Sequence, residues 1–384
     1  MEKIGIVGAG AMGTGIAQVA AQSGHQVVLF DTFPNAINKA KNNLQNTLLK
    51  LEEKGKIVSA SLIFSRFIFT EKIEQLSDCQ LIIEAIIEDA EIKKQMFLQL
   101  ENIVSNECIL ASNTSSLSIT SIAAACKNPS RVVGIHFFNP APIMVLVEII
   151  PALQSDEKIV AKSKHLIDSW QKKTVLCRDT PGFIVNRIAR PFYSESLRIL
   201  EEGIANIATI DHALRTFGGF RMGAFELMDF IGHDVNFRVT ESIFNANYYE
   251  PRYKPSLTQK RLFEAAWFGK KSGRGFYNYA ENASNPSIVN DENLQKNIAN
   301  RVVVMLINEA ADALLFNIAN RDDIDTAMQK GVNYPKGLLA WADEIGIENI
   351  VKQLDELYNY YHEDRYRCSA ILRKMASSGM KFYE

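Results

Sequence analysis

Three glycines with the spacing Gly8-x-Gly10-x-x-Gly13 directly follow the apolar segment 3–7 and precede a run of small residues, 14–23. Gly8 allows a tight turn, Gly10 lets the backbone approach a pyrophosphate, and Gly13 lets a helix pack close to a strand. The helix N-terminus adds unpaired N–H groups and the positive end of the helix dipole. The pattern therefore predicts a phosphate-binding strand–turn–helix unit whose loop also contains Ala11 and Met12.

An acidic residue stands where such a unit would bind a ribose. The second expected strand, 26–30, ends in Asp31, which lies 18 residues beyond Gly13. A carboxylate there accepts hydrogen bonds from the ribose hydroxyls of NAD. No arginine follows within several residues to bind a 2′-phosphate, so NAD is predicted rather than NADP.

Strands and helices alternate over the following hundred residues. Apolar spacing predicts helices over 36–54 and 92–104, and strands over 80–85, 108–111 and 131–135. This alternation predicts an α/β domain with a mainly parallel sheet and with ligands at the carboxyl ends of the strands. Polar residues lie at three such ends, namely Glu88, 113–116 and 136–140.

His136 and Glu148 form the candidate catalytic pair. His136 follows the strand 131–135, and Glu148 lies 12 residues later inside the apolar run 144–150. Taken alone, each has an ordinary structural interpretation, as a core histidine and a strand-edge charge. A carboxylate buried in an apolar strand needs a partner, however, because an unpaired charge there is costly. Bound to one imidazole nitrogen, the carboxylate fixes the tautomer and leaves the other nitrogen to act as a general base.

The ordered motifs resemble those of L-3-hydroxyacyl-CoA dehydrogenases of the 3-hydroxybutyryl-CoA dehydrogenase type. They occur in family order and spacing from residue 1 to about 280. The matching segments are the glycine loop, Ile83-Glu84-Ala85-Ile86-Ile87-Glu88, Ala111-Ser112-Asn113-Thr114-Ser115-Ser116-Leu117, His136-Phe137-Phe138-Asn139-Pro140, Pro181-Gly182-Phe183-Ile184-Val185-Asn186-Arg187 and Phe268-Gly269-Lys270-Lys271-Ser272-Gly273.

The resemblance implies a role for each matching residue. His136 is expected to take the proton of the substrate's 3-hydroxyl group, and Glu148 to orient and support the imidazolium. Ser115 and Asn186 are expected to hydrogen-bond the reacting oxygen. Lys54 and Ser115 match coenzyme A contacts, and no metal is expected. The cofactor contacts implied beside the glycine loop and Asp31 are Glu88, Lys93, Asn113, Ser115, Asn139 and Lys271.

Two positions depart from the family pattern. Val145 replaces a common lysine, and Arg221 replaces a common proline. Neither belongs to the expected proton relay, so they bear on acyl-chain preference. Arginine can bind a carboxylate through two parallel hydrogen bonds, and Arg221 is therefore one candidate for contacting a distal carboxylate. The alternative is that it faces solvent.

The sequence repeats itself beyond residue 280. Residues 186–232 align without a gap on 300–346 and are identical at 14 of 47 positions, whereas unrelated segments of ordinary composition would share about three. A weaker echo pairs Arg252-Tyr253 with Arg365-Tyr366. We therefore expect the helical domain to be duplicated, with the second copy serving as a scaffold and not as a second catalyst.

The predicted architecture is an α/β Rossmann-like NAD-binding domain (1–182) followed by two all-α C-terminal domains (183–280 and 294–384). The predicted function is NAD-dependent, reversible oxidation of (3S)-3-hydroxyacyl-CoA to 3-oxoacyl-CoA. One alternative is a dehydrogenase of a free hydroxy acid or sugar acid on the same fold. Another is an NAD-binding structural or sensor protein, which the presence of His136, Glu148 and Asn186 disfavours.

Composition narrows the expected partners. The net charge of −2 argues against a protein held by bulk charge to nucleic acid or to a membrane surface. The five cysteines form no CxxC pair, which predicts neither a zinc site nor a disulfide framework and favours the cytoplasm. The expected partners are an acyl-CoA substrate and, within the chain, the second helical copy. We expect this internal pseudo-dimer to make the protein a monomer or a weak homodimer.

Overall fold

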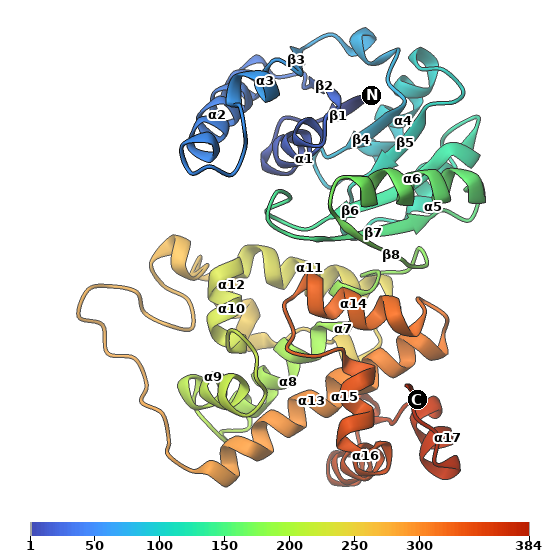
Figure 1. The fold of residues 1–384 in the computed structure, drawn as a ribbon. Helices are drawn as coiled ribbons and strands as arrows, with labels where there is room; N and C mark the ends of the chain where they lie inside the picture. Colours follow the sequence, from blue (N-terminus) through green and yellow to red (C-terminus); the bar gives the residue numbers. More distant parts are fainter. Residues whose placement is uncertain (1, 384) are drawn as a thin grey trace. The chain divides into compact units, whose positions relative to one another are not determined.

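The computed structural model describes residues 2–383. The chain folds into two compact units. The first unit is Met1–Thr180 and the second is Pro181–Glu384 (Figure 1). Both copies of the helical repeat therefore lie within the second unit.

One eight-stranded sheet forms the centre of the first unit, with the strand order β3-β2-β1-β4-β5-β6-β7-β8. Neighbouring strands pair in parallel except β6 and β7, which are antiparallel. This confirms the prediction of a mainly parallel α/β sheet. The strands are β1 (Lys3–Val7), β2 (Gln26–Phe30), β3 (Phe67–Thr70), β4 (Leu81–Glu84), β5 (Ile109–Ser112), β6 (Val132–Phe137), β7 (Leu146–Pro151) and β8 (Lys173–Leu176).

Helices cover the sheet of the first unit (Figure 1). All four residues of β4 are buried, so both of its faces are packed against other elements. The first helix begins at Ala11, ahead of the small-residue run 14–23 that follows the glycine loop, because Thr14 N–H already bonds to the carbonyl of Gly10 at 2.9 Å. The helices are α1 (Ala11–Gln22), α2 (Pro34–Glu53), α3 (Ala60–Phe64), α4 (Ala90–Ile103), α5 (Ile119–Ala123) and α6 (Glu157–Ser169), with short 3-10 turns at η1 (Ile73–Leu76) and η2 (Pro129–Arg131).

The second unit is helical, and its two copies repeat local contacts as well as sequence. Asp211 accepts hydrogen bonds from the backbone N–H groups of Phe225 and Glu226 and from a tyrosine hydroxyl. Its counterpart Asp325 accepts the corresponding three bonds. The first copy contains α7 (Val185–Ile188), α8 (Arg190–Glu201), α9 (Ile207–Thr216), α10 (Ala224–Ile231), α11 (His233–Ala246), η3 (Pro251–Tyr253), α12 (Leu257–Glu264) and η4 (Lys270–Ser272). The second contains α13 (Glu292–Leu315), α14 (Arg321–Gly331), α15 (Leu338–Ile345), α16 (Ile347–Tyr361), η5 (Asp364–Tyr366) and α17 (Ala370–Ser378).

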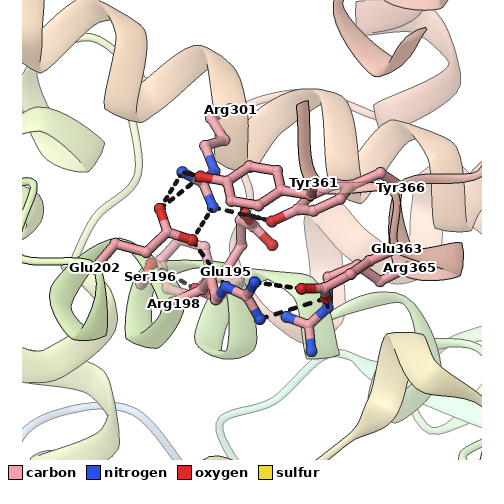
Figure 2. Close-up of polar contacts among 10 residues, drawn as sticks. Glu195, Ser196, Arg198, Glu202, Arg301, Tyr361, Glu363, Arg365 and Tyr366 are labelled. Carbon is pink, nitrogen blue, oxygen red and sulfur yellow. Dashed lines mark hydrogen bonds and ion pairs between the residues drawn. The ribbon is translucent and has the colours of Figure 1, made fainter. Parts of the chain in front are cut away.

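Reciprocal ion pairs join the two copies. Arg301 of the second copy donates to Glu195 of the first, with 2.6 Å between Nε and Oε1 (Figure 2). The equivalent Arg187 of the first copy donates to Glu309 of the second at 3.1 Å. Residue i of one copy thus contacts residue j of the other and vice versa, which is the pattern of a twofold-symmetric interface.

The segment between the copies, 280–291, contains no helix or strand. It is attached to the first copy near α9, because Asn206 donates to the carbonyl of Ser287 at 2.9 Å and Val289 N–H donates to Thr209 at 2.9 Å. Among the helices in residues 2–383, none is long and apolar enough to cross a membrane.

Candidate active site

The glycine loop connects β1 to α1 and has the backbone geometry that its sequence predicts. Gly8 adopts φ of +106°, and a Cβ there would lie 2.7 Å from the carbonyl oxygen of Ala85. A Cβ on Gly13 would lie 1.8 Å from the carbonyl oxygen of Gly8. By contrast, a Cβ on Gly10 would meet no atom within 4 Å. The loop therefore needs glycine at its two packed positions and leaves open space at Gly10, where a ligand's phosphate can approach the backbone.

Asp31 directly follows β2 and is hydrogen-bonded to the glycine loop. Its carboxylate accepts hydrogen bonds from Ala9 N–H at 2.7 Å and from Phe33 N–H at 3.0 Å. A cavity of about 730 Å³ lies beside it, lined by residues of the glycine loop, the end of β2, the segment after β4 and α4. This volume is in the range of small-molecule sites, so the residues present fit the adenosine half of a dinucleotide.

His136 and Glu148 face each other across neighbouring strands. They are paired in register on β6 and β7, and His136 Nδ1 lies 2.7 Å from Glu148 Oε2. Glu148 is fully buried and His136 is 5% exposed. Residues directly opposite each other in an antiparallel pair point to the same face of the sheet, so the two side chains lie side by side. The geometry fixes the imidazole through Nδ1 and provides a negative charge to balance a protonated ring.

Glu88 organises the loop that carries Ser115. Its Oε1 accepts hydrogen bonds from the Thr114 hydroxyl at 2.5 Å, from Ser115 N–H at 3.0 Å and from the Ser116 hydroxyl at 3.1 Å. Burial by itself raises the pKa of Glu88, but Lys93 and these hydrogen bonds outweigh it and hold the pKa below its ordinary value. Glu88 is therefore held as a carboxylate that shapes the 114–116 turn.

A buried ion pair that motif analysis alone does not identify supports this loop. Glu84, at the end of β4, is fully buried and accepts hydrogen bonds from Lys93 Nζ at 2.6 Å and from the Ser112 hydroxyl at 2.7 Å. Lys93 also lies 3.3 Å from Glu88. Lys93, expected at the cofactor, is thus 1% exposed and bridges two carboxylates. The same cost of burying an acid in an apolar strand that indicates Glu148 could have indicated Glu84.

Three further residues that were expected at the site differ in exposure and in hydrogen bonding. The Asn113 side chain accepts a hydrogen bond from Phe137 N–H at 2.8 Å and so ties the end of β5 to β6. Asn139 is exposed and precedes Pro140 through a cis peptide bond. Lys54 is exposed at the C-terminal end of α2. Among these three, only Asn113 has its side chain fixed by a hydrogen bond that the structure identifies.

The remaining expected residues belong to the second unit. Asn186 lies in α7 and is half-buried, and its backbone carbonyl accepts a hydrogen bond from Arg190 at 2.8 Å. Lys271 lies in η4 and forms an ion pair with Asp234 at 2.5 Å. Within the first unit, the structure thus brings together His136 with Glu148, and Glu88 with Ser115.

A lysine outside the predicted set holds the loop that follows His136. Lys172 Nζ donates to the carbonyls of Ala141 and Met144 at 2.6 and 2.7 Å. Burial lowers the pKa of Lys172 to about 8. The loop also packs on α1, because a Cβ on Gly15 would lie 3.2 Å from Pro142. No spacing motif marks Lys172, because its partners are backbone carbonyls.

Comparison with known proteins gives matches over the whole chain. The NAD-binding domain model of 3-hydroxyacyl-CoA dehydrogenases matches residues 3–180, and the C-terminal domain model of the same family matches twice, at 182–279 and 298–381. The 3-hydroxyadipyl-CoA dehydrogenase of Escherichia coli strain K12 is 38% identical, with 98% of each chain covered.

Solved structures agree with these matches. A crystal structure of a 3-hydroxybutyryl-CoA dehydrogenase from E. coli K12 has a TM-score of 0.93 and 37% identity, covering 98% of this chain and 99% of that one. The (S)-3-hydroxybutyryl-CoA dehydrogenase of Ralstonia eutropha has a TM-score of 0.70 and 34% identity, covering 73% of this chain and all of that one.

Proposed function

The chain belongs to the 3-hydroxyacyl-CoA dehydrogenase family and is an NAD-dependent dehydrogenase, and from this premise we propose that it interconverts (3S)-3-hydroxyacyl-CoA and 3-oxoacyl-CoA with His136 as the general base. The observation that carries the proposal is the buried 2.7 Å contact between His136 Nδ1 and Glu148 Oε2. The (S) configuration is supported by the name of the R. eutropha relative.

His136 takes the proton of the 3-hydroxyl group at Nε2, because Nδ1 faces Glu148. A base is needed because loss of hydride from an alcohol that keeps its proton would leave a strongly cationic oxygen. Glu148, fully buried, stabilises the imidazolium that forms. In the reverse direction, the same imidazolium returns the proton to the oxygen of the ketone.

The loop 8–13 and Asp31 are proposed to hold NAD, with Asp31 accepting from a ribose hydroxyl and the N-terminus of α1 facing the pyrophosphate. NAD, when bound, supplies the acceptor for the hydride. The buried pair of Glu84 and Lys93 sets the position of Glu88 and, through it, the 114–116 turn. Lys93 thereby acts on the cofactor site through Glu88, and Asn113 acts on it by tying the end of β5 to β6.

Ser115 and Asn186 are proposed to donate hydrogen bonds to the reacting oxygen. Neutral donors stabilise the negative charge that develops on a carbonyl oxygen in the reduction direction. The role proposed for Ser115 is supported by its backbone position, because its N–H group donates a hydrogen bond to Glu88 at 3.0 Å. The roles of Asn186, Asn139, Lys271 and Lys54 rest on the family motifs in which these residues occur.

The second helical copy is proposed to replace a partner subunit. The reciprocal pairs Arg187–Glu309 and Arg301–Glu195 support this, because a twofold interface is otherwise formed between identical chains. Tethering the copies in one chain gives an effective concentration on the order of millimolar, so that internal pairing competes well with pairing between chains. We therefore propose a monomer with one NAD and one active site per chain.

A steady-state assay of NADH oxidation tests the substrate class. We expect turnover with acetoacetyl-CoA and turnover lower by orders of magnitude with free acetoacetate at the same concentration, because the CoA group supplies binding energy. Comparable rates with both compounds would instead support a dehydrogenase of free hydroxy acids. A panel of acyl-chain lengths in the same assay then identifies the preferred acyl-CoA.

A further inference from the structure

A second cavity lies within the helical unit, and no residue that lines it has been assigned a role in the reaction described above. Its volume is about 460 Å³, within the range of small-molecule pockets. The buried side chains of Phe192, Phe220 and Tyr334 line it, and so do the exposed Arg221 and Phe230. Because Tyr334 comes from the second copy and the others from the first, the cavity exists only where the two copies meet.

Two cations in this cavity lack an acidic partner. Within residues 2–383, neither Arg221 nor Lys270 forms an ion pair or a side-chain hydrogen bond. The ammonium group of Lys270 instead lies over the rings of Phe230 and Tyr279, at 5.9 and 5.8 Å from their centres. The hydroxyl of Tyr334 is buried and has no hydrogen-bond partner among the described atoms. The cavity therefore combines aromatic walls with positive charge that no acidic side chain among the described residues pairs with.

The second copy provides an internal comparison for this charge. At the positions equivalent to Arg221 and Phe230 it has Pro335 and Glu344. Its own cation in this region, Lys336, is paired with Glu344. The first copy thus has a cation in place of a proline and a phenylalanine in place of the acid. The uncompensated charge is a property of one copy and not of the repeat itself.

We propose that this cavity binds an apolar carboxylate, with its hydrocarbon part against Phe192, Phe220 and Tyr334 and its carboxylate between Arg221 and Lys270. Aromatic and apolar walls favour a hydrocarbon chain or ring. Arginine binds a carboxylate through paired hydrogen bonds, and the anion supplies the charge that Glu344 supplies in the other copy. The carboxylate comes either from a free acid or from the distal end of an acyl-CoA substrate, and the second source rests on the proposed function.

Calorimetric titration of the full-length protein with octanoate tests the site directly. We expect binding that weakens about tenfold or more in Arg221→Pro and in Lys270→Ala, since each removes one charge-assisted contact. The first substitution introduces the residue that the second copy already has. Octan-1-ol is expected to bind more weakly than octanoate and to be unaffected by either substitution. Lys330→Ala, which removes an exposed cation outside the cavity, is the matched control.

Turnover of two substrates distinguishes the sources of the carboxylate. If Arg221→Pro lowers kcat/KM for an ω-carboxylated 3-oxoacyl-CoA and leaves that of acetoacetyl-CoA unchanged, the carboxylate is the distal end of a substrate. If it weakens octanoate binding and changes neither turnover, the ligand is a free acid. The proposal is overturned if neither octanoate binding nor the turnover ratio depends on Arg221 and Lys270. Should the enzyme turn over no acyl-CoA, the proposed function fails, while the octanoate titration still decides on the cavity.

Discussion

Replacing Glu148 with glutamine removes the negative charge beside His136 while keeping the shape of the side chain. The amide oxygen can still accept from Nδ1–H, so the ring stays oriented, but a neutral amide does not balance the imidazolium. A hydrogen bond to a charged group contributes about 1.5 kcal/mol more than a neutral one. The upper bound on the lost stabilisation is the whole Coulombic attraction between the imidazolium and the carboxylate, which is about 4 kcal/mol for charges about 4 Å apart at an effective dielectric constant of about 20.

These bounds convert directly into rates. Because about 1.4 kcal/mol corresponds to a tenfold change, we expect kcat of Glu148→Gln to fall between about tenfold and about a thousandfold. The assay is NADH oxidation at saturating acetoacetyl-CoA, with NADH affinity measured separately and expected to be unchanged. Glu157→Gln, which neutralises an exposed acid in the first turn of α6, is the matched control and should retain full activity. An unchanged kcat in a folded Glu148→Gln protein would refute the role given to this carboxylate.

NADP should be a poor substitute for NAD because its 2′-phosphate would meet the carboxylate of Asp31, and Asp31→Asn should raise kcat/KM with NADP; equal efficiency of both cofactors in the wild-type enzyme would contradict this. Burial raises the pKa of Glu202, but hydrogen bonds from Arg301, Tyr361 and Arg198 lower it to about 2 (Figure 2). The Glu202 carboxylate therefore stabilises the folded state fully above pH 4.5, and this contribution is lost as the pH falls towards 2. The pKa shift alone corresponds to roughly 3 kcal/mol, and solvent screening of this partly exposed carboxylate reduces it to about 2 kcal/mol. Urea unfolding should therefore show Glu202→Gln less stable than wild type by about this amount at pH 7 and nearly equal to it at pH 2, and a pH-independent difference would contradict the linkage. Deleting residues 294–384 should expose the apolar face of the first copy and cause dimerisation or aggregation in light scattering, whereas a fully active monomer would show that the second copy does not replace a subunit.

The dinucleotide loop could be predicted because its geometry is local. Gly8, Gly13 and Asp31 are fixed by a turn and by the first helix and second strand of the chain, which the spacing of glycines and apolar residues encodes. The pair of His136 and Glu148 could be predicted as well, because a buried strand acid needs a partner and the expected neighbouring strand ends at a histidine, which the structure places inside β6.

Other contacts depend on packing that no spacing reveals. Lys93 is bonded to Glu84 only because α4 packs on the sheet with that side chain pointing inward. Lys172 binds backbone carbonyls, which leave no trace in residue types. The repeat itself is visible in the sequence, but the reciprocal pairing of Arg187 and Glu309 depends on how the long helix α13 crosses the first copy.

Turnover of His136→Gln is the measurement that tests the central claim most directly. The substitution removes the proton acceptor and leaves the glycine loop and Asp31, which are proposed to bind NAD, unchanged. We predict that kcat for acetoacetyl-CoA reduction and for 3-hydroxybutyryl-CoA oxidation falls by about a hundredfold or more, the usual scale for a positioned general base, while NADH binds with wild-type affinity. Unimpaired turnover in this variant would contradict the assignment of His136 as the general base.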